Sequence, residues 1–186
     1  MSSTHKPKAE RGHDFYETPT WAVDIIVPHL PAASDVLDPC AGKGAILNAL
    51  AASRRWRTAL VRGFEIDHQH AGSHEHPTTY TDALSTSWGL PRLVVMNPPF
   101  GLAQEFAERA LVEVAPGGTV AALLRLAFLE STKRAGFHRA HPADVFVLAK
   151  RPSFTGGGTD SAAYAWFVWG PGRGGRWSVL GGEVLP

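Results

Sequence analysis

The chain has 186 residues, 44% of them hydrophobic and one of them cysteine, and its formal net charge is +1. This length and composition suit one domain with a filled core, and they exclude wholesale disorder and an internal disulfide framework. The apolar runs fall short of the ~20 residues that a membrane-spanning helix needs, and the N-terminal stretch lacks the apolar segment of a secretory signal. We therefore expect a protein of the reducing cytoplasm that stays out of membranes.

Helices and strands alternate along the predicted chain. Residues 1–13 are polar and are expected to form a flexible tail. Thr18 and Pro19 are typical of a helix start, and the apolar side chains that follow recur at helical spacing, which predicts a helix over residues 19–29. Further helices are expected over residues 44–53, 102–115 and 128–140, and apolar runs predict seven strands at residues 36–37, 58–67, 78–84, 92–100, 119–126, 144–150 and 162–169.

This alternation favours an α/β fold. Apolar strands that alternate with helices are typical of a parallel, doubly wound sheet that is covered on both faces. We therefore expect a mostly parallel, seven-stranded sheet with helices on both faces. The glycine-rich stretches TGGGTDS and GPGRGGR are expected to be loops within the same domain.

Polar side chains stand at the ends of four consecutive predicted strands. They are Asp38, Glu65, Asp82 and Asn97. In an open α/β sheet the ligand binds outside the carboxyl ends of the strands. Each of these residues alone is typical of a turn or a helix cap, but packing does not explain four of them at one edge. Together they predict a binding cleft.

The stretch DPCAGKG predicts a tight turn that a ligand approaches closely. Gly42 and Gly44 let the backbone turn sharply, and the helix that follows offers free N–H groups to an anion such as a carboxylate. A nicotinamide dinucleotide would use such a turn too, but Leu47 stands where its fingerprint has a third glycine.

The next two strand ends narrow the choice of ligand. Glu65, which lies 23 residues after Gly42, suits a grip on the two hydroxyls of a ribose. Asp82 can accept a hydrogen bond from the amine of an adenine, and Ile66 can pack on its ring. The implied ligand has a carboxylate, a ribose and an adenine but no pyrophosphate, which fits S-adenosylmethionine.

The fourth strand ends abruptly in VVMNPPF. Two prolines fix two φ angles and remove two N–H donors, and Asn97 is pushed toward an extended geometry by the proline after it. The side-chain oxygen of Asn97 and the carbonyl of Pro98 can accept the two N–H groups of a planar amine, such as that of adenine. The alternative interpretation is an ordinary turn after a buried strand, with Phe100 in the core.

Several stretches resemble the motifs of amino-methyltransferases that act on nucleic acids. DFYETP resembles their N-terminal cofactor motif, DPCAGKG the glycine loop, FEID the ribose acid and NPPF the catalytic tetrapeptide. RPSFTGGGTDSAAYAWFVW resembles the closing segment of small phage-type adenine-N6 DNA methyltransferases, and the motif order matches the gamma arrangement of the family. The resemblance implies a Rossmann-like class I methyltransferase fold. This family often carries a separate target-recognition domain, but few residues follow WFVW, so we expect residues 14–186 to form a single catalytic domain without one.

The resemblance also implies roles for individual residues. S-adenosylmethionine would be held by Tyr16, Thr18, Pro19, Asp38, Pro39, Ala41, Gly42, Gly44, Glu65, Ile66, Asp82, Ala83 and Asn97. Asn97, Pro98, Pro99 and Phe100 would act on an adenine flipped out of DNA, with no metal required. The nucleic acid, expected to be DNA, would be bound by Phe100, Arg125, Lys133, Arg134, Ser153, Phe154 and Thr155.

Other interpretations stay open at this point. The same pocket suits an adenine in RNA, the N4 amine of cytosine in DNA or a glutamine amide on a protein, and a non-catalytic nucleic-acid-binding module could keep the same fold. Cys40 follows a proline, as the nucleophile of cytosine-C5 methyltransferases does, but we expect it to be a small buried filler. His68, His70, His74 and His76 are interpreted as a polar loop rather than a zinc site.

Overall fold

The computed structural model describes residues 17–70, 75–154 and 161–182. The predicted tail at residues 1–13 and the predicted site residues Tyr16 and Thr155 lie outside these ranges, as does His74 of the histidine cluster. All other predicted site residues fall within the described part of the chain.

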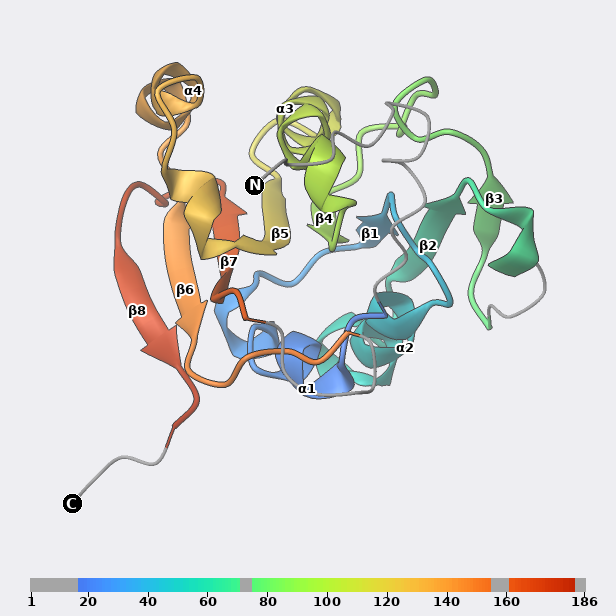
Figure 1. Ribbon diagram of the computed structural model, residues 1–186. Coiled ribbons are helices and arrows are strands. Elements are labelled where there is room, and N and C mark those ends of the chain that lie inside the picture. Colours follow the sequence, from blue (N-terminus) through green and yellow to red (C-terminus); the bar gives the residue numbers. More distant parts are fainter. Residues whose placement is uncertain (1–16, 71–74, 155–160, 183–186) are drawn as a thin grey trace.

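The described residues form one mostly parallel sheet of eight strands in the order β3-β2-β1-β4-β5-β7-β6-β8 (Figure 1). Five of its strand pairs are parallel, while β7 runs antiparallel to both β5 and β6. The strands are β1 (Asp35–Asp38), β2 (Leu60–Glu65), β3 (Thr78–Tyr80), β4 (Leu93–Met96), β5 (Thr119–Arg125), β6 (Asp144–Leu148), β7 (Tyr164–Trp169) and β8 (Trp177–Leu180).

The expected number of seven strands is wrong by one, because β8 pairs in parallel with β6 at the edge of the sheet. Three of its four residues are not buried, and Trp177 is 75% exposed, so the stretch lacks the apolar run of a core strand. The loop before β8 is tied to the sheet by Asp144, whose carboxylate accepts hydrogen bonds from the backbone N–H groups of Gly174 and Arg176. This tertiary contact, rather than a local pattern, places the strand.

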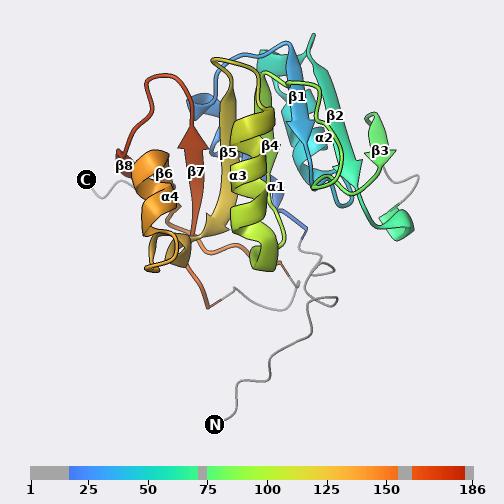
Figure 2. The same cartoon turned by 90° about the horizontal axis from the view of Figure 1, so that it is seen from above.

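Helices cover both faces of the sheet, as expected (Figure 2). One face carries α1 (Thr20–Asp24) and α2 (Ala45–Ala52), and the other carries α3 (Ala103–Glu113) and α4 (Ala135–Ala140). Side chains alternate between two apolar clusters along each inner strand. In β4, Val95 packs in the cluster that contains α1 and α2, while Val94 and Met96 pack in the cluster that contains α3 and α4.

Two helices are shorter than expected. The helix predicted over 19–29 ends at Asp24 and continues as a 3-10 turn, η2 (Val27–His29), because the ring of Pro28 would clash with the carbonyl four residues back in an α-helix. The helix predicted over 128–140 starts only at Ala135. Ser131 before it has a φ of 122°, which an α-helix does not tolerate, and the stretch begins as the 3-10 turn η6 (Leu126–Leu129).

The strand order creates a crevice at one edge of the sheet. The chain steps from β1 to β2 and β3 on one side, and then returns to β4 and β5 on the other side of β1. At such a point of reversal the loops after adjacent strands diverge and leave room for a ligand. The carboxyl ends of β1, β2 and β4 therefore meet where a binding site is expected.

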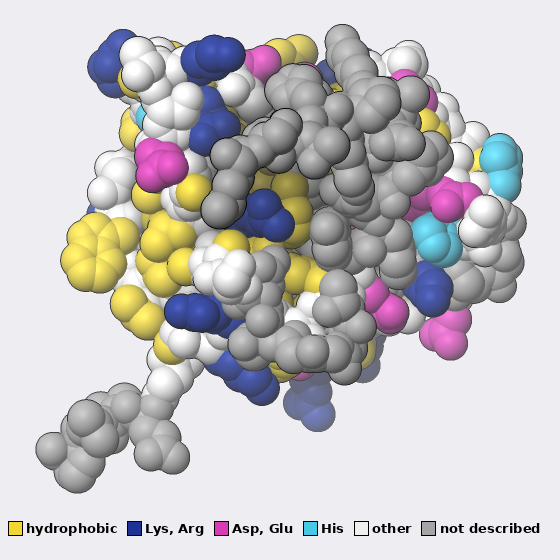
Figure 3. Space-filling view, in the orientation of Figure 1, with side chains coloured by type: hydrophobic (Ala, Val, Ile, Leu, Met, Phe, Trp, Pro, Cys, Tyr) yellow, Lys and Arg dark blue, Asp and Glu magenta, His cyan; other side chains and the backbone are white. Residues whose placement is uncertain are grey.

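The surface at the β8 end of the sheet is partly hydrophobic. Hydrophobic side chains gather on this side in Figure 3, and the exposed ones include Trp177 and Val179 of β8 and Leu129 of η6. No described helix is long and apolar enough to cross a membrane.

Candidate active site

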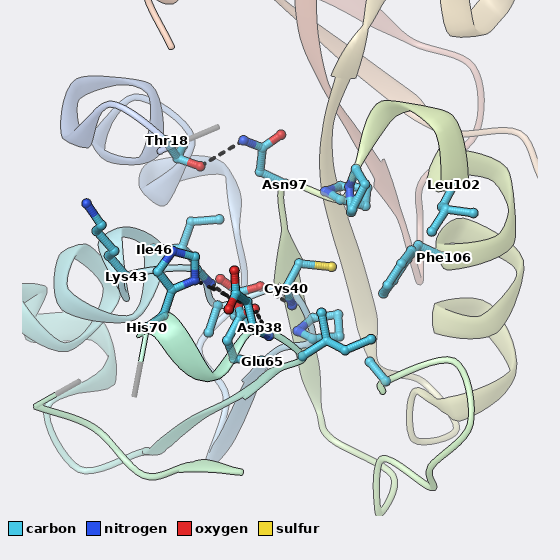
Figure 4. A pocket seen from close by; sticks show the side chains of 18 of the residues that line it. Thr18, Asp38, Cys40, Lys43, Ile46, Glu65, His70, Asn97, Leu102 and Phe106 are labelled. Atoms are coloured by element: carbon cyan, nitrogen blue, oxygen red, sulfur yellow. Dashed lines mark hydrogen bonds and ion pairs between the residues drawn. The ribbon is translucent and has the colours of Figure 1, made fainter. Parts of the chain in front are cut away.

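A pocket opens at the carboxyl ends of β1, β2 and β4 (Figure 4). It brings together the four polar residues that follow the predicted strands: Asp38, Glu65, Asp82 and Asn97. The other predicted residues that line it are Thr18, Pro39, Ala41, Gly42, Ile66, Ala83, Pro98 and Pro99, whereas Pro19, Gly44 and Phe100 do not.

The glycine loop between β1 and α2 forms the floor of the pocket. Gly42 and Gly44 have φ angles of 53° and 87°, which L side chains rarely adopt. Gly44 is buried, caps the start of α2 and donates to the carbonyl of Ala41 at 2.7 Å. It shapes the turn rather than lining the pocket. The N–H of Ala41 donates to the carbonyl of Phe64 in β2 at 2.9 Å, which holds the loop against the sheet.

Glu65 is fixed by the backbone on either side of the pocket. Its Oε2 accepts from the N–H of Gly42 at 2.6 Å, and its Oε1 accepts from the N–H of Asp67 at 2.7 Å. Nδ1 of His70 lies 3.7 Å from Oε1. A carboxylate has about four lone-pair sites, so these contacts orient the group and leave capacity for two hydroxyl donors. Ile66, which is 55% exposed, adds an apolar wall beside it.

Asp38 is a buried carboxyl, and one of its two oxygens differs from the other in its hydrogen bonding. Its Oδ1 accepts from the N–H of Cys40 at 2.9 Å, but Oδ2 has no hydrogen-bond partner among the described residues. Burial raises the pKa of Asp38 to about 7, against the opposing hydrogen bond from Cys40, and the charge of Glu65 adds to the rise. Such an oxygen on a pocket wall fits an N–H donor or a cation.

Cys40 differs from the expectation of a buried filler, because it is only partly buried and lines the pocket. Burial raises the pKa of its thiol well above the ordinary value, and the neighbouring charges of Asp38 and Glu65 raise it further. A thiol in this environment stays protonated and is a poor nucleophile.

Asp82 follows β3 and holds the turn after it. Its Oδ1 accepts from the N–H of Leu84 at 2.9 Å, and its Oδ2 accepts from the hydroxyl of Ser85 at 2.7 Å. The carboxylate therefore has a structural role in addition to lining the pocket. The carbonyl of the next residue, Ala83, accepts from the buried indole N–H of Trp88 at 2.8 Å, which steadies the same turn.

Asn97 directly follows β4, and its amide is oriented by the segment before α1. Its Nδ2 donates to the hydroxyl Oγ1 of Thr18 at 3.0 Å, and Thr18 itself is buried. This bond directs the side-chain oxygen away from Thr18 (Figure 4). Thr18, which the sequence predicts in the cofactor pocket, thus also fixes the orientation of the Asn97 amide.

Phe100 lies outside the lining of this pocket and joins an aromatic cluster beside it. Its ring centroid is 5.6 Å from that of Tyr164 and 6.0 Å from that of Phe154. The guanidinium carbon of Arg125 lies over the Phe100 ring at 4.4 Å, a contact that contributes about 0.5–2 kcal/mol in proteins. The structure therefore brings together Phe100, Arg125 and Phe154 of the predicted acceptor residues, with Ser153 next to Phe154.

Lys133 and Arg134 are not brought to the pocket. The guanidinium of Arg134 donates to the carbonyls of Phe128, Ala127 and Glu130 and lies over the Phe128 ring at 5.1 Å. It holds the turn between η6 and α4. Lys133 beside it is exposed, and neither residue lines the pocket.

Some residues of the site went unassigned in the sequence. Tyr164 lies in an apolar strand whose pattern resembles core, and Phe106 lies in an ordinary amphipathic helix. The pocket lining also includes Glu17, Cys40, Lys43, Ala45, Ile46, Asp67, His70, Thr81, Leu84, Leu102 and Phe106. Lys43 lies inside the DPCAGKG motif, so its position in the pocket could have been predicted from the sequence. The described histidines form no group of three or more metal-ligating side chains with each other or with acidic or cysteine residues.

No known protein family and no curated protein matches this sequence. Solved structures do match. A predicted O-methyltransferase from Agrobacterium tumefaciens superposes with a TM-score of 0.60 at 18% identity, over 86% of this chain and 84% of that one. The chain has the class I methyltransferase fold.

Two further methyltransferases with this fold are larger proteins. A type I restriction-modification methyltransferase subunit from Streptococcus thermophilus matches with a TM-score of 0.60 at 15% identity, over 91% of this chain and 45% of that one. A dimethyladenosine transferase from Plasmodium falciparum matches with a TM-score of 0.58 at 11% identity, over 84% of this chain and 63% of that one. The chain thus spans less than half of the restriction-modification subunit. Identities this low show a shared fold and leave the acceptor to be argued from the site.

Proposed function

We propose that this chain is an S-adenosylmethionine-dependent methyltransferase that methylates the exocyclic N6 amine of an adenine flipped out of DNA. One observation carries the proposal. The Asn97-Pro98 tip lines the same pocket as the backbone-bound Glu65 carboxylate and Oδ2 of Asp38, which has no hydrogen-bond partner in the part of the chain that the structure describes. This arrangement supports a cofactor site and an amine-binding tip within one cavity.

The pocket residues fit the cofactor group by group. The Glu65 carboxylate suits the two ribose hydroxyls, and the exposed side chain of Ile66 suits one face of the adenine ring. The buried Oδ2 of Asp38 suits the ammonium group of the methionine part, because a buried acceptor is stabilised by a charged donor. When bound, S-adenosylmethionine supplies an electrophilic methyl group that an amine can attack directly.

The chain itself prepares the attacking amine. The lone pair of an adenine amine is spread into the ring, which makes the nitrogen a weak nucleophile. The side-chain oxygen of Asn97 and the carbonyl of Pro98 would accept its two N–H bonds and draw the nitrogen toward a tetrahedral shape. The bond from Asn97 to Thr18 keeps the amide oriented, and the two prolines keep the tip stiff. Rigid placement of this kind lowers the barrier without further movement in the reaction.

The features around the tip favour a base in DNA over the other acceptors. The aromatic cluster at Phe100 offers stacking to a planar base, which a glutamine amide lacks. The resemblance of RPSFTGGGTDSAAYAWFVW to the closing segment of phage-type adenine-N6 DNA methyltransferases favours DNA over RNA. The structural neighbours support methyl transfer in general, since their named acceptors differ.

A methylation assay tests this function. The protein is incubated with labelled S-adenosylmethionine and, separately, with duplex DNA, single-stranded DNA, RNA and a protein mixture, and the products are digested and identified. We expect label in N6-methyladenine from DNA. Asn97→Ala should lower turnover by about 100-fold or more, as loss of one positioned hydrogen-bonding group does in other enzymes, and should leave cofactor affinity nearly unchanged.

The matched control is Asn48→Ala, which removes an exposed asparagine from α2 and should keep full turnover. Label found only in RNA or only in protein would contradict DNA as the acceptor and would identify RNA or protein as the acceptor instead. Undiminished turnover by the Asn97 variant would remove this residue from the mechanism.

A further inference from the structure

Three aromatic rings gather beside the Asn97 tip. Phe100 follows the two prolines, Phe154 lies in the connection between β6 and β7, and Tyr164 begins β7. The Phe154 and Tyr164 centroids are 5.1 Å apart, and both rings contact Phe100. Because β7 runs antiparallel to β5, its first residue reaches the same edge of the sheet as the last residue of β5. The cluster therefore belongs to the edge that carries the pocket.

Arg125 covers one of these rings. It is the last residue of β5 and is exposed, although the six residues before it are buried. Its guanidinium carbon lies 4.4 Å from the Phe100 centroid, and its Nε donates to the hydroxyl of Tyr164 at 3.3 Å. The two residues are also register partners across β5 and β7. Tyr164 thus holds the guanidinium over Phe100.

A guanidinium in this position occupies space that a stacked base would need. Planar cations and planar bases both bind to the face of an aromatic ring, and they cannot share one face of Phe100. When a base replaces the guanidinium, its stacking on Phe100 compensates for the loss of the contact between Arg125 and the ring. A glutamine amide has no ring and regains less.

Building on the function proposed above, we propose that Arg125 closes the acceptor site of the free protein and leaves the Phe100 ring when a base enters, and that Tyr164 is the positioning residue that holds it closed. The displaced guanidinium then pairs with a phosphate of the same nucleic acid, for which its planar set of donors is suited. The site thereby admits a base that is joined to a phosphate chain and disfavours an isolated amine.

The test uses a single-stranded trinucleotide whose central base is 2-aminopurine. Its fluorescence falls when the base stacks on an aromatic ring, and it has no duplex to open. Affinity is measured by fluorescence titration at about 50 mM and about 500 mM salt, because high salt screens a phosphate contact far more than a stacking contact. The proteins are the wild type, Arg125→Gln, Tyr164→Phe and the control Arg151→Gln, which removes another exposed arginine after β6.

The proposal predicts a reversal of sign with salt. Arg125→Gln should bind about 3-fold or more weakly than the wild type at low salt, where the phosphate contact counts, and more tightly at high salt, where only the loss of the closing contact remains. Tyr164→Phe keeps the ring and the charge but loses one hydrogen bond, so it should bind about 2- to 10-fold more tightly at both salt concentrations. Arg151→Gln should be weaker at low salt and equal to the wild type at high salt.

Arg125→Gln that binds more weakly at every salt concentration would reduce Arg125 to a phosphate contact and overturn the proposal. An affinity of Tyr164→Phe equal to that of the wild type would also overturn it. The same holds if the trinucleotide does not bind the wild type, or if it binds without a fall in the 2-aminopurine fluorescence. The methylation assay separates this inference from the proposed function. Methyl transfer to DNA without the reversal refutes only the inference, whereas the reversal without methyl transfer refutes only the proposed reaction.

Discussion

The Asp38 carboxyl is kept in a pocket where its negative charge is unfavourable. Its burial raises the pKa to about 7, and the nearby Glu65 charge adds to the effect. The residue is therefore protonated in the free protein at mildly acidic pH. A ligand that brings a positive charge next to Oδ2 favours the ionised form and releases a proton on binding.

This linkage predicts a pH dependence of cofactor affinity. Affinity for S-adenosylmethionine should rise by up to about tenfold per pH unit below about pH 7 and level off above it, because the Asp38 proton no longer has to be displaced. Asp38→Asn keeps the acceptor for the N–H of Cys40 but cannot ionise, so its affinity should be weaker and flat over the same range. Calorimetric titration at several pH values, in two buffers that differ in ionisation enthalpy, measures both the affinity and the released proton.

The stability of the free protein provides an independent control for the same residue. The folded pKa lies above the ordinary value of 3.8, so between about pH 4 and 7 the folded state holds more protons than the unfolded state. The contribution of Asp38 is therefore fully present below about pH 4 and is lost as pH rises toward 7. The Asn variant should lack this loss, and an identical pH profile in both proteins would contradict the assignment.

Residues at strand ends could be predicted from the sequence, and residues within apolar runs could not. Asp38, Glu65 and Asn97 could be predicted because polar residues stand at the ends of several strands that share one edge of the sheet, which packing alone does not explain. Tyr164 was not, since its surroundings in AAYAWFVW are those of a core strand and its contact with Phe100 depends on the reversed direction of β7. The orientation of the Asn97 amide could not be predicted either, because it depends on a tertiary contact with Thr18.

Among the secondary-structure elements, the edge strand β8 is held in place by contacts of one buried carboxylate, Asp144. Asp144 accepts from the backbone of Gly174 and Arg176, and its carboxylate pairs with the guanidinium groups of Arg173 and Arg176 at 3.2 Å and 2.8 Å. These contacts outweigh its burial and hold the pKa of Asp144 well below the ordinary value. The stretch GPGRGGR is thereby turned back onto the sheet, and β8 follows.

Asp144→Asn should destabilise the protein by about 1.5–3 kcal/mol at neutral pH, the usual contribution of hydrogen bonds to a charged group. Because the folded pKa is depressed, this contribution is present above about pH 4 and shrinks as pH falls below it. Urea unfolding at pH 7 and near pH 3 measures the difference, and amide exchange of residues 177–180 should quicken in the variant. Asp24→Asn, an exposed change at the end of α1, is the control; equal effects of both changes would contradict the role of Asp144.

The other elements follow from patterns that the sequence displays. The strands of the sheet centre are buried on both faces, so they are short, continuous apolar runs with turn residues after them. The ends of the helices were harder to predict. Helical spacing continues past Asp24 and starts before Ala135, and only the ring of Pro28 and the backbone of Ser131 set the true limits.

At the scale of the whole molecule, the topology brings several basic residues to the edge that also carries the carboxylates of the pocket, although the net charge is only +1. Lys43 follows β1, Arg125 ends β5, and Lys150 and Arg151 follow β6. These strands run in the same direction, so the basic residues after them come out on the side of the pocket. A small number of phosphate contacts is therefore expected.

This arrangement predicts a shallow salt dependence of DNA binding. With roughly two to four phosphate contacts, the logarithm of the association constant should fall with the logarithm of salt concentration at a slope of about −2 to −4. Lys150→Gln should reduce the slope by about 1 and weaken binding equally for all sequences. Fluorescence anisotropy with a labelled duplex measures both. Lys133→Gln, which lies near α4 rather than at a strand end, is the matched control; a larger change in the control would place the DNA elsewhere.

The reversed direction of β7 also has a consequence for how such a protein can diversify. The segment between β6 and β7 leaves the sheet and re-enters it at a single edge, and both of its anchors are set by the register that pairs Val147 with Ala165. Residues can be inserted or removed between these anchors without shifting any side chain of the sheet to the opposite face. The connection that carries Phe154 can therefore change in length, by natural variation or by engineered grafting, while the sheet stays intact.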